Sequence, residues 1–216
     1  MSLRINDIAP DFTAETTDGT IRFHEWIGDG YAVLFSHPKD FTPVCTTELG
    51  LVAGMAEKFA ERNVKILGIS VDPIADHLKW KSDIEVATGH AVGYPMIADE
   101  DMSVAKLYGM LPAEAEPGNR TPADNQTVRS VFLIGPDTRI KLILTYPMTT
   151  GRNFDEILRA IDSIQLTAAH KVATPANWVQ GEDVIITPAV SNEEAVERFG
   201  TFETVLPYLR KTKQPG

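Results

Sequence analysis

A single thiol is the group in this sequence best placed to do chemistry. Residues 36–48 read SHPKDFTPVCTTE, and Cys45 within them is the only cysteine among 216 residues. If Thr42 is an N-cap and Pro43 the first helical residue, Cys45 takes the third helical position. Its sulfur then stands where a capping box carries a carboxylate, near unpaired N–H groups and the positive end of the helix dipole. The stretch therefore predicts a nucleophilic thiolate, whereas the ordinary alternative for a lone cysteine is a small buried hydrophobe.

A helix end alone is not enough to ionise such a thiol. It supplies about 0.3–1 kcal/mol, and an ordinary thiol, with a pKa of about 8.5, is only a few per cent ionised at neutral pH. A cation within about 4–6 Å shifts an acid by roughly 1–3 pKa units. We expect Arg129, which opens an apolar strand, to be this cation; the alternative is a guanidinium in solvent. Arg152, His37 and Glu48 likewise have ordinary alternatives as a surface, a strand-end and a first-turn residue.

The pattern of the chain around these residues indicates an α/β scaffold. YAVLFS at 31–36 and VKILGISVD at 64–72 are apolar runs of strand type. Apolar residues recur at helical spacing between them, so we expect a helix from about 43 to 63. A second helix is expected at 74–89. Strand, helix and strand in this order predict a parallel βαβ unit with a buried sheet.

The elements that follow complete a thioredoxin-like order. We expect a short helix at 99–111, a loop rich in Pro, Gly, Glu and Asn at about 112–125, and a hairpin at 128–147 with a GPDT turn. Asn153 then caps a helix, with Glu156 three residues later. A central βαβ unit followed by a hairpin and a helix predicts a thioredoxin-like α/β fold.

The residue pattern of the sequence changes near Thr167, after which prolines recur at positions 175, 188 and 207. We expect residues 1–166 to form the main domain and 167–216 a small C-terminal appended domain, with one strand pair and one short helix. About fifty residues hardly form a core alone, so this segment is expected to pack on the main domain or on a second subunit.

Composition excludes several classes of protein. The formal charge of −10 and pI of about 4.9 argue against a nucleic-acid or anionic-membrane surface, either of which needs a basic patch. No signal-peptide core or membrane span is apparent. A single cysteine forms no internal disulfide, so we expect a reducing, cytoplasmic location. The five histidines show no zinc-ligand spacing, and we expect neither metal nor cofactor.

With these residues in place, the sequence resembles the peroxiredoxins, which are AhpC/TSA-type thiol peroxidases. SHPKDFTPVCTTE matches their Pro-x-x-x-Thr-x-x-Cys motif at Pro38, Thr42 and Cys45. Further segments similar to the one-cysteine peroxiredoxin six subgroup are FHEWIGDGYAVLFSHP, VKILGISVD, LYGML, VFLIGPD, YPMTTGRNFDEILRAIDSIQLT and VATPANWVQGEDV. The resemblance is collinear from residue 1 to about 210.

The resemblance implies a peroxidase that works through Cys45 as a sulfenic acid. The thiolate of Cys45 would reduce hydrogen peroxide or an alkyl hydroperoxide to water or alcohol, with Thr42 and Arg129 binding the peroxide oxygens. By the same resemblance Pro38 shields the sulfur, Glu48 and Arg152 orient Arg129, and His37 lines the pocket. Because the chain has no second cysteine, an external thiol or other donor must reduce the sulfenic acid. The family also implies a homodimer, in some members a higher oligomer.

Two other readings of the residues stay open at this point. A cysteine hydrolase would pair Cys45 with a histidine, and His37 lies only eight residues away. A non-enzymatic, chaperone-like binding module would leave the cysteine inert. An alkylating reagent separates an activated thiol from an inert one, and peroxide then separates a peroxidase from a hydrolase.

Overall fold

A computed structural model describes residues 2–113 and 126–216. The chain divides into two compact units, Met1–Arg152 and Asn153–Gly216. The boundary expected at 166/167 lies inside helix α6, Phe154–Ala169, which belongs to the second unit. Most of the loop expected at 112–125 lies outside the described residues.

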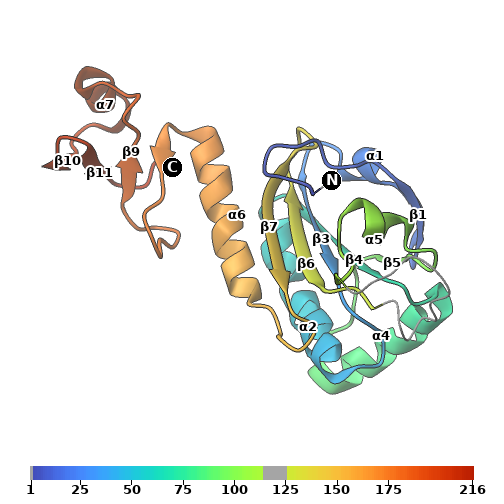
Figure 1. Cartoon of the computed structure of the whole chain (residues 1–216). Coiled ribbons are helices and arrows are strands. Elements are labelled where there is room, and N and C mark those ends of the chain that lie inside the picture. Colours follow the sequence, from blue (N-terminus) through green and yellow to red (C-terminus); the bar gives the residue numbers. More distant parts are fainter. Residues whose placement is uncertain (1, 114–125) are drawn as a thin grey trace. The chain divides into compact units, whose positions relative to one another are not determined.

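The first unit is built on a seven-stranded mixed sheet with the order β2-β1-β5-β4-β3-β6-β7 (Figure 1). Its strands are β1 Thr13–Thr16, β2 Gly19–Arg22, β3 Tyr31–Ser36, β4 Val64–Ser70, β5 Met96–Ala98, β6 Arg129–Ile134 and β7 Ile140–Tyr146. The apolar runs of β3 and β4 pair in parallel, from Tyr31 opposite Val64 to Ser36 opposite Ile69. The predicted hairpin is confirmed as β6 and β7, which extend the sheet antiparallel to β3.

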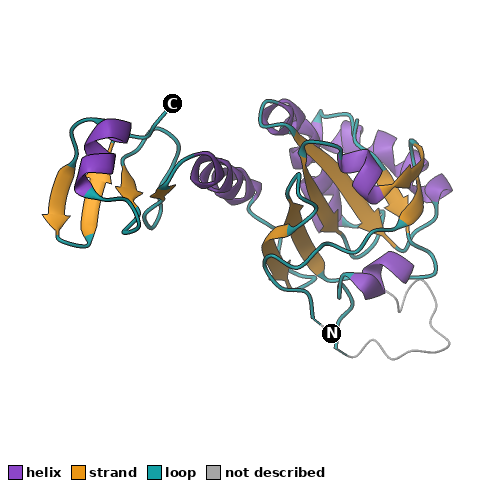
Figure 2. Ribbon diagram, turned by 90° about the horizontal axis from the view of Figure 1, so that it is seen from above, coloured by secondary structure: helices purple, strands orange, loops and turns teal. Residues whose placement is uncertain are grey.

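Helices cover both faces of this sheet (Figures 1 and 2). They are α1 Phe23–Ile27, α2 Pro43–Gly54, α3 Ala56–Ala60, α4 Ile74–Thr88 and α5 Ser103–Leu107. Alternate residues of β3 face opposite ways: Leu34 joins the apolar core that α1 and α5 share with the sheet, and the ring of Phe35 contacts Tyr94 on the other side, where Tyr94 donates to the Leu49 carbonyl of α2. The fold is therefore the thioredoxin-like α/β architecture that the element order predicts.

Two helix predictions need correction. The single helix expected from 43 to 63 is two helices, because the chain leaves helical geometry at Met55 (φ −99°, ψ 3°) directly after Gly54, and glycine is a common site of kinks. The helix expected at 99–111 is shorter, because the carboxylate of Asp99 accepts the N–H groups of Val104 and Ala105 and so serves as a cap. Strands β1, β2 and β5 and helix α1 were not predicted.

The second unit holds helix α6 and a four-stranded antiparallel sheet with the order β10-β11-β9-β8. Asn153 caps α6 as predicted, accepting the N–H of Glu156 at 3.1 Å. The expected strand pair is confirmed as β8 and β9 and the short helix as α7, whereas the hairpin of β10 and β11 was missed. The bounds are β8 Val172–Ala173, β9 Val184–Ile186, α7 Asn192–Phe199, β10 Glu203–Leu206 and β11 Leu209–Thr212. No helix in the described parts of the chain is long and apolar enough to cross a membrane.

Candidate active site

The predicted site residues of the first unit gather at one edge of the sheet. The loop after β3 leads into α2 and Cys45, and the loop after β4 lies beside it because the two strands are parallel. Strand β6 runs antiparallel to β3, so it begins at this same edge with Arg129. Strand β7 ends there with Tyr146 opposite Arg129, and the chain continues to Arg152. Segments far apart in sequence thus meet at this edge.

Cys45 is buried and lies beside a cation. Its side chain is 0% exposed, and Nη1 of Arg129 donates to its Sγ at 3.3 Å. The sulfur thus accepts a hydrogen bond from a buried guanidinium. The expectation that Arg129 comes to the sulfur agrees with this geometry, and the alternative of a solvent-exposed head is excluded because Arg129 is 3% exposed.

The guanidinium of Arg129 is fixed from two other directions. Its Nε donates to the Met148 carbonyl at 2.8 Å, and its Nη1 also donates to Oε2 of Glu48 at 2.6 Å. Because both nitrogens have rigid partners, the guanidinium keeps its orientation before any substrate arrives. Such preorganisation lets a hydrogen-bond donor stabilise developing charge without reorganising during the reaction.

Glu48 in turn is held by Arg152. Its Oε1 accepts from the backbone N–H of Arg152 at 2.8 Å and from Nε at 3.0 Å, and its Oε2 accepts from Nη2 at 2.8 Å. The same guanidinium donates to the carbonyls of Ser36 and Ser130. Burial raises the pKa of Glu48, but the hydrogen bonds and charge of Arg152, together with the charge of Arg129, outweigh it and hold that pKa below its ordinary value. Glu48 is therefore a buried carboxylate shared by two arginines.

The first turn of α2 differs from the expected capping arrangement. Thr42 is the N-cap by its backbone and Pro43 is the first helical residue, as predicted. The prediction of a capping-box geometry is wrong, because the Thr42 hydroxyl donates to the carbonyl of Lys39 at 2.8 Å and does not cap the helix. Its oxygen is thus oriented by the loop, and Pro38 in the same loop is buried.

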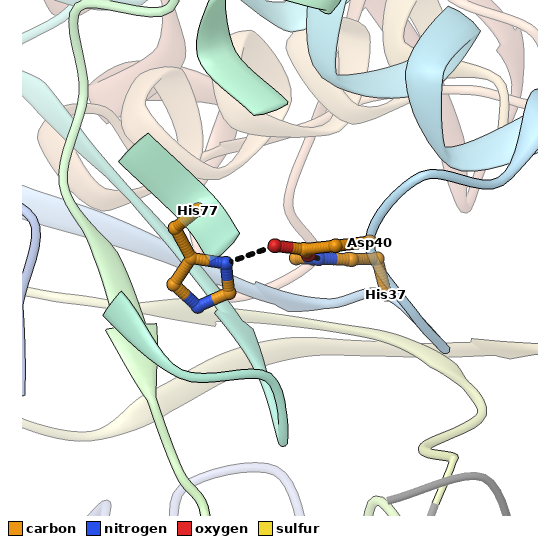
Figure 3. Close-up of side chains that lie close together, drawn as sticks. All are labelled: His37, Asp40 and His77. Atoms are coloured by element: carbon orange, nitrogen blue, oxygen red, sulfur yellow. Dashed lines mark hydrogen bonds and ion pairs between the residues drawn. The ribbon is translucent and has the colours of Figure 1, made fainter. Parts of the chain in front are cut away.

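His37 belongs to a buried cluster that the sequence did not indicate. Figure 3 shows the rings of His37 and His77 converging on the carboxylate of Asp40, with Nε2 of His37 2.7 Å from Oδ1 and Nδ1 of His77 2.6 Å from Oδ2. Asp40 stands in the loop after β3 and His77 on α4, a separation at which no spacing pattern links them. Within the described residues, His37 is hydrogen-bonded to Asp40 and the sulfur of Cys45 accepts from Arg129, so the hydrogen bond between Cys45 and His37 that a hydrolase requires is not formed.

Two histidines and an aspartate are residue types that bind metal ions, but the distances between their nitrogen and oxygen atoms are those of hydrogen bonds. Within the described residues, the ligand atoms of His37, Asp40 and His77 lie within 4.8 Å of one another. Two ligands at about 2.0–2.1 Å from a tetrahedral zinc ion are roughly 3.3 Å apart. The contacts of 2.6 and 2.7 Å are hydrogen-bond distances, so the arrangement is that of a hydrogen-bonded array.

Comparison with known proteins agrees with the site. Residues 5–143 match the AhpC/TSA family, and residues 163–201 match the C-terminal domain of 1-Cys peroxiredoxin. Mouse peroxiredoxin-6 is 49% identical over 99% of this chain and 98% of its own length. The crystal structure of a C45S mutant of Arenicola marina peroxiredoxin 6 superposes with a TM-score of 0.92 at 45% identity, covering 99% of both chains. A yeast mitochondrial 1-Cys peroxiredoxin superposes with a TM-score of 0.90 at 50% identity, covering 98% of this chain and 99% of the other.

These matches span nearly the whole chain and agree with a buried Cys45 beside Arg129 on a thioredoxin-like sheet. The chain belongs to the AhpC/TSA family and is a one-cysteine peroxiredoxin of the peroxiredoxin-6 subgroup, a thiol peroxidase.

Proposed function

We propose that the residues around Cys45 divide the work of peroxide reduction as follows. The thiolate attacks one oxygen of the hydroperoxide, so an S–O bond forms as the O–O bond breaks, and the second oxygen leaves as hydroxide or alkoxide, which takes a proton from solvent to become water or alcohol. Cys45 remains as a sulfenic acid. The observation that carries this proposal is the contact of Arg129 with the sulfur, because the same guanidinium is within reach of an oxygen bound there.

The other residues of the site support this step in distinct ways. Arg129 stabilises the negative charge on the departing oxygen, and Glu48 with Arg152 keeps Arg129 in place. The hydroxyl of Thr42 donates a hydrogen bond to the backbone carbonyl of Lys39, so the lone pairs of its oxygen can accept an O–H of the hydroperoxide. Pro38, buried in the same loop, limits access of water to the sulfur.

Hydrogen peroxide and small alkyl hydroperoxides are the proposed substrates, and an external thiol is the reductant. A thiol attacks the sulfenic sulfur and releases water, and a second thiol reduces the mixed disulfide, which restores Cys45. The yeast relative is described as resolved via glutathione/thioredoxin systems, so we propose glutathione or a thioredoxin here as well. A reducing location such as the cytoplasm suits this cycle.

We further propose a homodimer in which the C-terminal domain, expected from residue 167, takes part in the interface. The match of residues 163–201 to the C-terminal domain of 1-Cys peroxiredoxin supports it. Light scattering on a sizing column tests this directly, and a mass equal to one chain of 23.7 kDa would contradict it.

Stopped-flow reaction with hydrogen peroxide tests the role of Cys45. We expect one rapid, stoichiometric step, with one dimedone adduct on Cys45 in the mass spectrum, and neither in Cys45→Ser. A rate no higher than that of free cysteine would refute the proposed chemistry of this site.

A further inference from the structure

The array of His37, Asp40 and His77 lies wholly inside the first unit. The two histidines are 0% exposed and Asp40 is 2% exposed. A buried carboxylate flanked by two imidazoles is expensive unless each polar atom has a partner. The partners that the structure provides therefore indicate where the protons lie.

His77 faces an acceptor on each side. Its Nδ1 lies 2.6 Å from Oδ2 of Asp40, and its Nε2 lies 3.1 Å from the carbonyl oxygen of Ile97. A carbonyl only accepts, so Nε2 carries a proton, and a second proton on Nδ1 makes an ion pair with the carboxylate. Burial lowers the pKa of His77, but the hydrogen bond and charge of Asp40 outweigh it and raise that pKa. For Asp40, burial is outweighed by the two histidines, and its pKa falls to about 2.

His37 has an acceptor on one side alone. Its Nε2 lies 2.7 Å from Oδ1 of Asp40, whereas its Nδ1 is buried and has no hydrogen-bond partner within the described part of the chain. A proton on Nε2 satisfies Asp40 and leaves Nδ1 with a lone pair. An unpaired buried acceptor is a cost that proteins rarely carry without a reason.

The array also holds the backbone of the loop that carries Pro38 and Thr42. The N–H of Asp40 donates to Oδ2 of Asp72 at 2.9 Å, and that oxygen also accepts the Ser70 hydroxyl at the end of β4. The loop is thus tied to β4 through its backbone and to α4 through its side chain.

We propose that Asp40 and His77 are positioning residues of this peroxidase, which hold the loop of residues 37–42, and with it Pro38 and Thr42, in place next to the helix that carries Cys45. The proposal rests on the proposed roles of that loop in peroxide binding. Neither residue touches the sulfur, so the effect on Cys45 is indirect.

Three variants of the full-length protein test this. His77→Ala removes the ion pair, and we expect the second-order rate with hydrogen peroxide to fall by about tenfold to a hundredfold. His77→Asn places an amide N–H where Nδ1–H was, and should restore most of this loss. His90→Ala, at an exposed histidine just beyond α4, is the matched control and should react as the wild type does.

A second reagent separates positioning from general damage. Iodoacetamide alkylation of Cys45 depends on the thiolate and its accessibility, so it should stay within about twofold of the wild type in His77→Ala, because Arg129 keeps its own partners. A normal peroxide rate in His77→Ala, an equal loss in both reactions, or no rescue by asparagine would overturn the proposal. A wild type that forms no sulfenic acid would instead refute the proposed function of Cys45.

Nitrogen NMR of the histidine rings gives a test that needs no variant. We expect His77 doubly protonated at neutral pH and His37 with its single proton on Nε2. A neutral His77, or a proton on Nδ1 of His37, would overturn the assignment.

Discussion

Replacing Glu48 by glutamine removes one charge from the buried cluster beside Cys45 and keeps the size of the side chain. The carboxylate accepts four hydrogen bonds, three from Arg152 and one from Arg129. Glutamine has one acceptor oxygen, and its amide group donates. Whichever way the amide is turned, two of the four bonds are lost, because two bonds fall on each carboxylate oxygen.

The size of the effect follows from that geometry. A hydrogen bond to a charged group contributes about 1.5–3 kcal/mol, so the loss of two is about 3–6 kcal/mol. Breaking a buried ion pair by removing one partner is independently about 3–5 kcal/mol. Glu48 is 3% exposed, so solvent screens little of this. We expect the free energy of unfolding to fall by about 3–5 kcal/mol and the melting temperature by about 6–20 °C.

The effect of pH has a definite sign. The folded-state pKa of Glu48 lies below its ordinary value, so its contribution is complete above the unfolded pKa of about 4.3 and is lost as the pH falls through the folded pKa. Glutamine does not titrate in this range. The difference in the free energy of unfolding between wild type and Glu48→Gln should therefore have its full value at pH 6–7 and become smaller below about pH 4.

Urea unfolding followed by tryptophan fluorescence, at pH 7 and at steps down to pH 3, measures both quantities. Glu57→Gln on α3, where the glutamate is exposed, is the matched control and should change stability by less than about 0.5 kcal/mol. A Glu48→Gln protein within about 1 kcal/mol of the wild type at pH 7, or a gap that stays constant into acid, would refute the reasoning.

Two further substitutions probe the loop and the helix packing. Thr42→Val removes the hydroxyl that is held by Lys39, so we expect the peroxide rate to fall by about tenfold to a thousandfold while iodoacetamide alkylation is unchanged; equal peroxide rates in stopped flow would contradict this. Gly50→Ala puts a Cβ against Oγ1 of Thr88 and 2.6 Å from its Cβ, so α2 and α4 must move apart, and the free energy of unfolding should fall by about 1–3 kcal/mol. A melting temperature at or above that of the wild type would show that the helices part without strain.

Much of the fold could be predicted because its signals are local. The buried strands β3 and β4, the hairpin of β6 and β7 and the Asn153 cap each depend on a few neighbouring residues. Strands β1 and β2 were not predicted because they are short, partly exposed and lack an apolar run. The break between α2 and α3 at Met55 was not predicted because apolar residues continue at helical spacing across it.

The sequence by itself determined which atom reacts and that this atom lies at the N-terminal end of a helix. One cysteine, placed three residues after Thr42 and two after Pro43, fixes where the thiol lies relative to the first turn, because that relation is set by local backbone geometry. The sequence also indicated that a cation must lie near the sulfur, because the helix dipole alone is too weak to ionise a thiol.

Only the tertiary structure decided which groups surround that thiol. Arg129 reaches the sulfur because β6 runs antiparallel to β3 and begins at the edge where β3 ends. Glu48 is shared by two arginines, and Asp40 by His37 and His77, because the loops and helices that follow the parallel strands meet the antiparallel hairpin at that same edge. Such contacts depend on strand order and register, which no spacing within one segment records.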